Sequence, residues 1–308
     1  MASLRVIRPG MLTTVQDLGR WGHQDRGVPV AGPMDAYSHR RANRLVGNPE
    51  DAGALEITLL GPELEADAET LCIVAGAHFD VSVNGVPTDA TAAFVVPPHA
   101  RVRFGARRAG SRATLAVRGG FAVPKTFESR ATSVISRMGP FGGRPLMAGD
   151  VLPIGRPSMQ QGFPTGHPLT MPDGGARVRI IRGPHDTTFT SGAFDTLVGS
   201  RFVVSAQSNR MGYRLEGPVL RHAGGADILS EATPFGSVQV PASGQPILLM
   251  ADRQTTGGYP KIGTVITADL PIAGQLAPGD WIAFTECTRA EAIDALRQRE
   301  AALSGADR

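Results

Sequence analysis

Two similar stretches, Leu146-Met-Ala-Gly-Asp-Val-Leu-Pro-Ile154 and Leu276-Ala-Pro-Gly-Asp-Trp-Ile-Ala-Phe284, decide the fold. In each, a Gly-Asp turn leads into an apolar segment of strand length. A Leu-Glu pair followed by Gly-Pro precedes them, at 55–62 and at 215–218. Because the order is the same, the sequence predicts two similar β-barrel-like halves, residues 1–160 and 173–308, joined near Pro157–Pro172. Chance similarity between short turn motifs is the alternative.

Short apolar or alternating segments bounded by Gly, Pro, Asn or Asp recur along the chain and predict strands. Glycine and proline, at 38 and 24 of the 308 residues, supply many turn positions between them. Asn84-Gly85 predicts a hairpin, because both residues tolerate a positive φ. The predicted strands are Leu71–Ala75, Phe79–Val83, Ala92–Val96, Val102–Phe104, Thr114–Val117, Val178–Ile181, Phe202–Ser205 and Ile247–Met250.

Helices are predicted at three places only. Asp35 is a suitable N-cap for a helix that ends at Gly47, and a second helix is expected over 191–198. Thr288 and Glu291 form a capping-box pattern at the start of a terminal helix. Because strands outnumber helices and do not alternate with them, the sequence predicts a mainly β fold with few short helices and excludes a doubly wound α/β protein.

The composition excludes several classes of protein. Apolar residues make up 42% of the chain and charged residues 19%, which argues against disorder. No apolar run approaches the roughly 18 residues of a membrane span. The amino terminus carries no apolar secretory signal, so we expect a cytoplasmic protein. The net charge is +3 and the basic residues are dispersed, which argues against binding of nucleic acid.

Lysine occurs only at Lys125 and Lys261, so arginine supplies the other 29 of the 31 basic residues. A lysine that persists against this bias is a candidate for a chemical requirement. Cys72 and Cys287 are too few and too separated for a disulfide framework or a thiolate metal cluster, and their role stays open. The seven histidines show no i, i+4 pair, so no metal site is predicted.

Common motifs of nucleotide and hydrolase chemistry are absent from the sequence. It contains no Walker-type phosphate loop, no His-Glu-x-x-His, no Cys-x-x-Cys and no Gly-x-Ser-x-Gly elbow. If the function consumes ATP, the nucleotide is therefore expected on another chain.

Three blocks combine polar residues with glycine and proline beside an apolar strand, which is where a rigid scaffold usually carries its binding groups. The first runs from Thr14-Val-Gln-Asp-Leu-Gly-Arg-Trp-Gly22 through Gly27-Val-Pro-Val-Ala-Gly-Pro-Met-Asp35. The second is Gln207-Ser-Asn-Arg-Met-Gly-Tyr-Arg-Leu-Glu-Gly217, and the third is Ala251-Asp-Arg-Gln-Thr-Thr-Gly-Gly-Tyr-Pro-Lys261.

These blocks, with Leu55-Glu-Ile-Thr-Leu-Leu-Gly-Pro62 and Arg118-Gly-Gly-Phe-Ala-Val-Pro124, resemble the biotin-dependent carboxyltransferase-like family of the allophanate hydrolase subunit 2 type, over about residues 4–287. The resemblance implies a cyclophilin-like β-barrel architecture. It also implies a subunit 1-type partner, the B subunit, that shares the active site, and a further 5-oxoprolinase subunit. The implied activity is ATP-dependent opening of 5-oxoproline to glutamate, with ATP used by the complex, no cofactor bound by this chain, and no activity of the chain alone.

Opening a lactam requires polarisation of a carbonyl and a general acid or base for the nitrogen, and a carboxylate on the substrate requires a cation. The polar blocks offer residues of each type. The candidate catalytic residues are Lys261, Asp252 and Asp17, and the candidate substrate-binding residues are Gln207, Asn209, Arg210, Tyr213, Arg253, Tyr259 and Asp35.

Several of these residues also have a purely structural interpretation. Asp35 is placed to cap a helix, and Asp17 to cap a turn. Arg210 and Arg253 are equally suited to structural ion pairs. Tyr213 and Tyr259 are equally suited to packing. Lys261 is the strongest candidate for a site role, because lysine is rare and a Gly-Gly-Tyr-Pro segment leads up to it.

Two other functions remain open. One is the carboxyltransferase component of a biotin-dependent urea or amide carboxylase. The chain has no Met-Lys dipeptide for biotin attachment, so the carrier would be a separate protein. The other is a regulatory binding protein that antagonises a kinase inhibitor.

Overall fold

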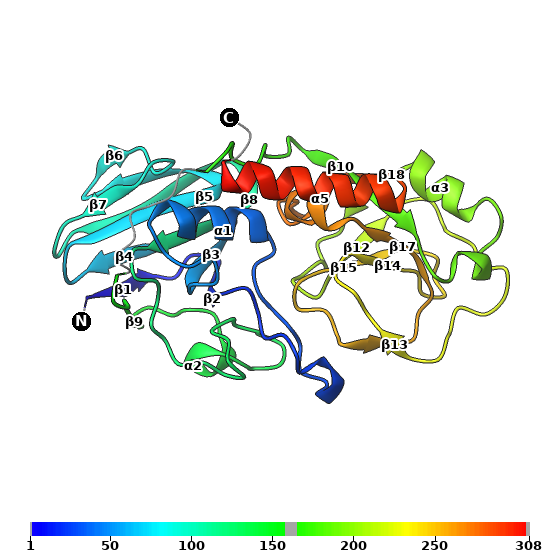
Figure 1. The fold of residues 1–308 in the computed structure, drawn as a ribbon, viewed down its shortest axis with the longest axis horizontal. Helices are drawn as coiled ribbons and strands as arrows, with labels where there is room; N and C mark the ends of the chain where they lie inside the picture. Colours follow the sequence, from blue (N-terminus) through cyan, green and yellow to red (C-terminus); the bar gives the residue numbers. More distant parts are fainter. Residues whose placement is uncertain (1, 158–164, 306–308) are drawn as a thin grey trace. The chain divides into compact units, whose positions relative to one another are not determined.

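The computed structural model describes residues 2–157 and 165–305 and divides the chain into two compact units. The first comprises Met1–Arg20, Ala31–Met171 and Ala301–Arg308, and the second comprises Trp21–Val30 and Pro172–Glu300. Both are built mainly of strands, as predicted (Figure 1). The units are discontinuous in sequence, unlike the continuous halves 1–160 and 173–308 that the sequence predicts. Residues 158–164 of the expected connection lie outside the described residues.

A nine-stranded sheet forms the first unit, with the main order β2-β3-β8-β4-β1-β9 and with β5 pairing β6, β7 and β8. The outer strands of this path, β2 and β9, do not pair, so the sheet stays open. Its strands are β1 (Ser3–Arg8), β2 (Leu12–Gln16), β3 (Ala54–Thr58), β4 (Glu63–Ala66), β5 (Thr70–Val83), β6 (Val86–Thr88), β7 (Phe94–Val96), β8 (Arg101–Val117) and β9 (Val151–Pro153).

The long strands β5 and β8 each join two of the predicted short strands into one. Their antiparallel pairing is irregular between Gly76 and Val81, where the register shifts three times. These bulges let the strands bend without ending, and Gly76 adopts φ 90° there. A glycine that reads as a strand boundary in the sequence is thus a bend within a strand. The hairpin at Asn84-Gly85 is confirmed, with both residues at positive φ between β5 and β6.

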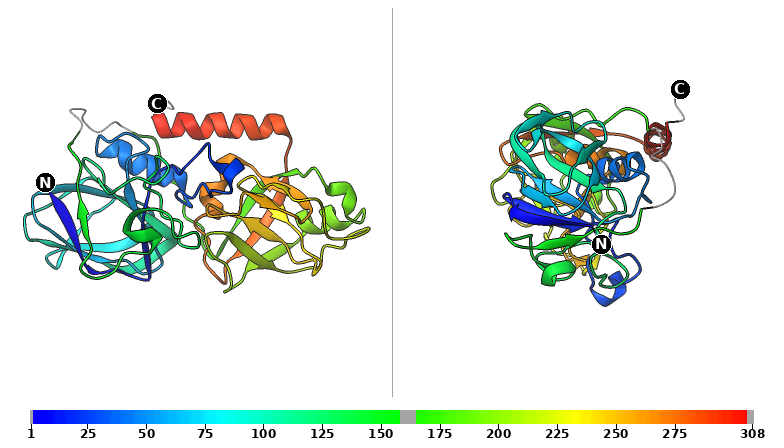
Figure 2. Two further views of the ribbon diagram at one scale, coloured as in Figure 1. Left: turned by 90° about the horizontal axis from the view of Figure 1, so that it is seen from below. Right: turned by 90° about the vertical axis from the view of Figure 1, so that its left-hand side faces the viewer.

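Seven strands of the second unit close into a barrel in the order β10-β17-β14-β15-β12-β11-β18, seen in green to orange in Figure 2. Fully buried aromatic and aliphatic side chains fill it, including Phe202 and Phe284, whose rings meet edge to face. The barrel strands are β10 (Gly175–Arg182), β11 (Arg201–Val204), β12 (Gly212–Glu216), β14 (Ser237–Gln239), β15 (Ile247–Leu249), β17 (Lys261–Val265) and β18 (Trp281–Glu286). A two-stranded sheet, β13 (Glu231–Ala232) with β16 (Thr256–Gly257), completes the unit.

The repeated Gly-Asp sequences form the same turn in both units. Gly149 and Gly279 have φ 90° and 93°, which only glycine adopts at little cost. The side chains of Asp150 and Asp280 each accept a hydrogen bond from the backbone N–H three residues earlier, at 2.7 and 2.8 Å. Each turn then leads into a strand, β9 or β18, that pairs antiparallel with the strand β1 or β11. The sequence similarity thus corresponds to one local geometry used twice.

The helices begin where the sequence places their caps. Asp35 caps α1 (Ala36–Leu45), whose buried face packs with β5 and β8. At the start of α5 (Arg289–Ser304), the side chains of Thr288 and Glu291 each accept a hydrogen bond from the other's backbone N–H, which is a capping box. The other helices are α2 (Pro140–Gly143), α3 (Ala193–Gly199), α4 (Leu270–Ala273) and the 3₁₀ turns η1 (Gln24–Arg26), η2 (Asp186–Thr188) and η3 (Thr267–Asp269). No described helix combines the length and the apolar character needed to cross a membrane.

Candidate functional site

The ten predicted site residues divide between the two units. Asp17 and Asp35 belong to the first unit, and the other eight belong to the second. Within the second unit, they lie on β12 and β17 and in the loops that precede β12, β16 and β17.

Both predicted aspartates of the first unit are buried and organise backbone. Asp35 accepts hydrogen bonds from the backbone N–H and the hydroxyl of Ser38, at 2.8 and 2.6 Å, and so caps α1. Asp17 follows β2 and accepts hydrogen bonds from Gly19 N, Ser129 Oγ and Arg130 N. In these positions the carboxylates hold the loops that follow β2 and precede α1.

A buried histidine and a buried glutamate, which the sequence analysis did not single out, lie near Asp17. Burial lowers the pKa of His39 to about 4, against smaller opposing effects from the carboxylates of Asp17 and Glu56. Asn43 Nδ2 lies 3.2 Å from Nε2 of His39 and donates to it when that nitrogen is unprotonated. Glu56 accepts a hydrogen bond from Met34 N at 2.7 Å. No spacing in the sequence marks these residues, because they meet only when α1 packs on the sheet.

In the second unit, Arg210 and Asp252 form a buried ion pair. Nε and Nη2 of Arg210 donate to the two carboxylate oxygens of Asp252 at 3.1 and 3.0 Å. Both side chains are almost completely buried. Asp252 N also donates to Arg210 O, so the loops that carry the two residues are joined by backbone as well. With both of its oxygens engaged by Arg210, the Asp252 carboxylate organises the loops here.

Lys261, the first residue of β17, lies 96% buried beside a carboxylate and a histidine. Its Nζ donates to Ala232 O at 2.9 Å and forms an ion pair with Glu231, a contact that lowers the pKa of Glu231. Its backbone N–H donates to His185 Nδ1 at 3.2 Å, which leaves the ring proton on Nε2, 3.3 Å from a Glu231 oxygen. The ammonium is therefore fixed in place. Glu231 and His185 carry no motif by which the sequence could reveal them.

Arg253 is 92% buried, and it differs from Arg210 in its partners. Nε of Arg253 donates to Thr233 O at 2.7 Å, and the guanidinium lies 5.4 Å from the ring centroid of Phe235. Within the described ranges, no carboxylate pairs with it. Burial lowers the pKa of Arg253 to about 10, which still leaves it charged at neutral pH. The second unit thus holds a buried guanidinium whose charge is not balanced by a neighbour.

The remaining predicted residues fall into two settings. Tyr213 is 99% buried and its hydroxyl donates to Leu276 O at 3.3 Å, so it belongs to the barrel core. Asn209 and Tyr259 line a pocket of about 210 Å³ together with Gln239 and Gln254. Gln254 Nε2 donates to Gln239 Oε1, and Gln239 Nε2 donates to Tyr259 O, each at 3.2 Å. Gln207 is exposed on the turn that precedes Asn209.

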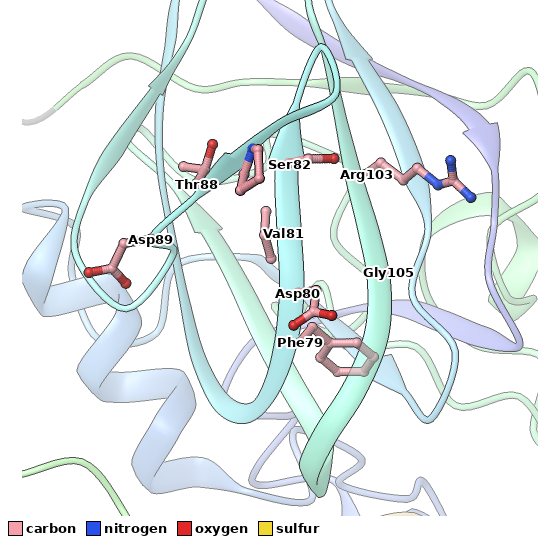
Figure 3. Close-up of a pocket in the computed structure, with 9 residues that line it drawn as sticks. Phe79, Asp80, Val81, Ser82, Thr88, Asp89, Arg103 and Gly105 are labelled. Atoms are coloured by element: carbon pink, nitrogen blue, oxygen red, sulfur yellow. The ribbon is translucent and has the colours of Figure 1, made fainter.

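A larger hollow, of about 610 Å³, lies on the first unit over residues of β5, β6 and β8 and is lined by none of the predicted residues (Figure 3). Its lining includes Phe79, Asp80 and Asp89. The Asp80 carboxylate accepts hydrogen bonds from Nε and Nη2 of Arg108, at 3.0 and 2.5 Å. The Asp89 carboxylate accepts one from the backbone N–H of Thr91. Because none of the predicted site residues lines this hollow, and eight of the ten belong to the second unit, we place the candidate site in the second unit.

Neither cysteine lines the pocket of the second unit walled by Asn209 and Tyr259 or the one walled by Arg253. Cys72 and Cys287 are free thiols, and burial raises the pKa of Cys72 to about 12. Over residues 2–157 and 165–305, no group of three or more His, Cys, Asp or Glu side chains is arranged to hold a metal ion.

Comparison with known proteins gives one family and several relatives. The family described as "Carboxyltransferase domain, subdomain A and B" matches residues 26–286. The 5-oxoprolinase C subunit of Escherichia coli (strain K12) is 39% identical over 96% of this chain and 95% of that protein. Urea amidolyase of Lachancea kluyveri is 32% identical over 98% of this chain.

The chain covers only part of the urea-utilising relatives. It spans 18% of the Lachancea kluyveri urea amidolyase. The crystal structure of the K. lactis urea amidolyase superposes with a TM-score of 0.93 at 30% identity, over 98% of this chain and 20% of that one. The chain is therefore similar to a segment of these proteins and to nearly the whole of the 5-oxoprolinase C subunit.

Proposed function

Because the chain belongs to the carboxyltransferase domain family, subdomains A and B, we propose that it is the C subunit of an ATP-dependent 5-oxoprolinase. In this role it acts with a subunit 1-type chain, the B subunit, and a further subunit, in the cytoplasm, to open 5-oxoproline to glutamate. The observation that carries the proposal is the near-complete match to the 5-oxoprolinase C subunit in both directions. A urea-utilising relative contains such a chain only as a segment.

The buried cations of the second unit suit the chemistry of lactam opening. Water adds to the lactam carbonyl, the C–N bond breaks, and the nitrogen leaves with a proton, giving a carboxylate and an amine. The transition state carries negative charge on the carbonyl oxygen, which a fixed cation in a dry site stabilises. Lys261, held by Glu231 and Ala232 O, is the residue that we propose for this task.

ATP belongs to the complex and not to this chain in the proposal. No Walker-type loop occurs in the sequence, so a partner is expected to bind the nucleotide. Asp252, tied to Arg210, supports loops of the second unit in this scheme. Asp17, tied to backbone N–H groups, supports a loop of the first unit. The proton for the leaving nitrogen then comes from a partner chain.

Reconstitution tests the proposal. The chain, the subunit 1-type protein and the third subunit, taken from neighbouring genes, are co-expressed and purified. We expect them to co-elute in size-exclusion chromatography and to hydrolyse ATP only when 5-oxoproline and all three chains are present. Separate peaks at micromolar concentration, or ATP hydrolysis that ignores 5-oxoproline, would contradict it.

The same preparation distinguishes the other functions. Carboxylation of urea that depends on an added biotinylated carrier would identify a carboxyltransferase component instead. A complex that forms without any turnover would favour a regulatory binding protein.

A further inference from the structure

Two of the three buried cations that the structure describes in the second unit are bound by successive carbonyl groups, at the end of strand β13 and at the residue after it, Thr233. Lys261 Nζ donates to Ala232 O, and Arg253 Nε donates to Thr233 O. Both carbonyl-bearing residues also line a pocket of about 230 Å³. Its other walls include Trp21 and Gln24 from the segment 21–30, and the pocket lies wholly within the second unit.

Arg253 lines this pocket with most of its hydrogen-bonding capacity unused. A guanidinium has five N–H donors. Of these, only Nε has a partner among the residues that the structure describes. A buried cation without a counter-charge is costly, and proteins normally pair it. In the same unit, the buried Arg210 guanidinium is paired in this way with the Asp252 carboxylate. The pocket therefore presents a vacant fork of the shape that a carboxylate fills with two parallel hydrogen bonds.

The other walls narrow the class of ligand. Trp21, 61% exposed, contributes an aromatic side chain to the wall of the pocket. The volume is below the roughly 300 Å³ at which pockets for drug-sized ligands begin, so the ligand is small. None of the described residues that line the pocket carries a carboxylate, which disfavours a cationic ligand.

We propose that Arg253 binds the carboxylate of a small cyclic amide acid in this pocket and thereby selects such acids over neutral amides. The assignment rests on the proposed function. Lys261 binds the preceding carbonyl, Ala232 O, which makes the pocket a neighbour of the cation that we propose for the reacting carbonyl of the substrate.

The test changes the protein and the ligand in turn. In the reconstituted complex, ATP hydrolysis is measured with 5-oxoproline and with 2-pyrrolidinone, the same ring without the carboxylate. Arg253→Met is expected to raise KM for 5-oxoproline about 10- to 100-fold, the usual range for losing a charged hydrogen bond. It should leave the already poor use of 2-pyrrolidinone unchanged. The variant lacks the guanidinium and this ligand lacks the carboxylate, so both changes remove the same interaction. Arg253→Lys should recover part of the effect.

Arg221→Met, at an exposed arginine of the same unit, is the matched control and should change neither value. Thermal unfolding is followed in parallel because Arg253 also holds Thr233. The ligand comparison on the wild-type complex needs no variant: equal use of both ligands would overturn the proposal. So would an Arg253→Met variant that loses both ligands to the same extent.

Binding separates this inference from the proposed function. If the wild-type complex does not turn over 5-oxoproline, the proposed function is wrong. Calorimetric binding of 5-oxoproline that Arg253→Met abolishes would still support the pocket. Binding that is absent, or unaffected by Arg253→Met, would overturn it.

Discussion

Both units bury cations and carboxylates, including Arg20 and Arg112 in the first and Asp252 in the second, but several of these groups differ in their partners. In the first unit, buried carboxylates such as Asp17 and Asp35 accept hydrogen bonds from backbone N–H groups and hydroxyls, and burial keeps His39 neutral. In the second unit, the buried groups include three cations, of which Arg210 and Lys261 have carboxylate partners and Arg253 has none in the described structure.

The difference in pairing distinguishes buried groups that stabilise the fold from the Arg253 guanidinium, for which we propose a ligand. A carboxylate that organises a loop has its acceptor positions filled by that loop, so little remains for chemistry. A buried cation without a counter-charge stabilises the fold less than a neutral side chain of similar size would. Its presence is better explained by binding, and this is why the second unit is the better place to look for substrate.

The largest effect should come from breaking the paired cation. Asp252→Ala leaves Arg210 buried without its partner, and we expect the free energy of unfolding to fall by about 3–5 kcal/mol. The double variant Arg210→Met/Asp252→Leu, which removes both charges, should recover most of this loss. Urea-induced unfolding measures both values. Arg108→Met, at an exposed ion pair of the first unit, should produce no measurable change. A loss below about 1 kcal/mol for the single variant would show that the pair is not important for stability.

The neutral histidine of the first unit predicts a pH dependence. His39 has a pKa of about 4 in the folded chain and about 6.5 when unfolded. The unfolded chain therefore binds the proton first. Stability is fully present above pH 6.5 and is lost as the pH falls towards 4, by about 3 kcal/mol from this group.

Carboxylates titrate in part of the same range, so the measurement is a difference between two proteins. The free energy of unfolding is compared from about pH 7.5 to about pH 4 for the wild type and for His39→Gln, which has no group to protonate. The variant should show the weaker pH dependence. If the free energy of unfolding falls equally with pH in both proteins, His39 does not contribute to the pH dependence of stability.

Lys261 tests the proposed chemistry. Lys261→Met keeps much of the stem and removes the charge. The lost charged hydrogen bond should cost about 1.5–3 kcal/mol, or a roughly 10- to 150-fold loss of activity in the reconstituted complex. Glu231 is 43% exposed on its side chain, so water can solvate it in the variant and folding should survive. Lys125→Met, at the exposed second lysine, is the control and should be much milder. Near-wild-type turnover, or a loss explained by unfolding, would remove Lys261 from the site.

The smallest effect is expected at Asp35, where capping and substrate binding make different predictions. Asp35→Ala should cost about 1 kcal/mol of stability, because α1 loses its N-cap. Asp35→Asn keeps an oxygen for the Ser38 N–H and should cost less. If Asp35 only caps, the Asn variant retains the activity of the complex. A stable Asn variant that has lost activity would indicate that Asp35 contacts the substrate.

Local features were readable from the sequence. The hairpin at Asn84-Gly85, the cap at Asp35, the capping box at Thr288 and the two Gly-Asp turns all depend on residues within three or four positions of one another. Such contacts follow from the φ preferences and hydrogen-bonding groups of neighbouring residues. The strand-rich class follows from the same signals.

Tertiary structure decided what depends on distant residues. Arg210 and Arg253 occur in similar polar loops. The fold pairs Asp252 with Arg210, 42 positions away, and not with Arg253, its neighbour in the chain. Likewise the segment 21–30 joins the second unit although the chain around it belongs to the first. Sequence determines which side chains are available for charge pairing and recognition. Which charge finds a partner, and which is left facing a pocket, is set by chain closure over tens of residues, and no local preference records it.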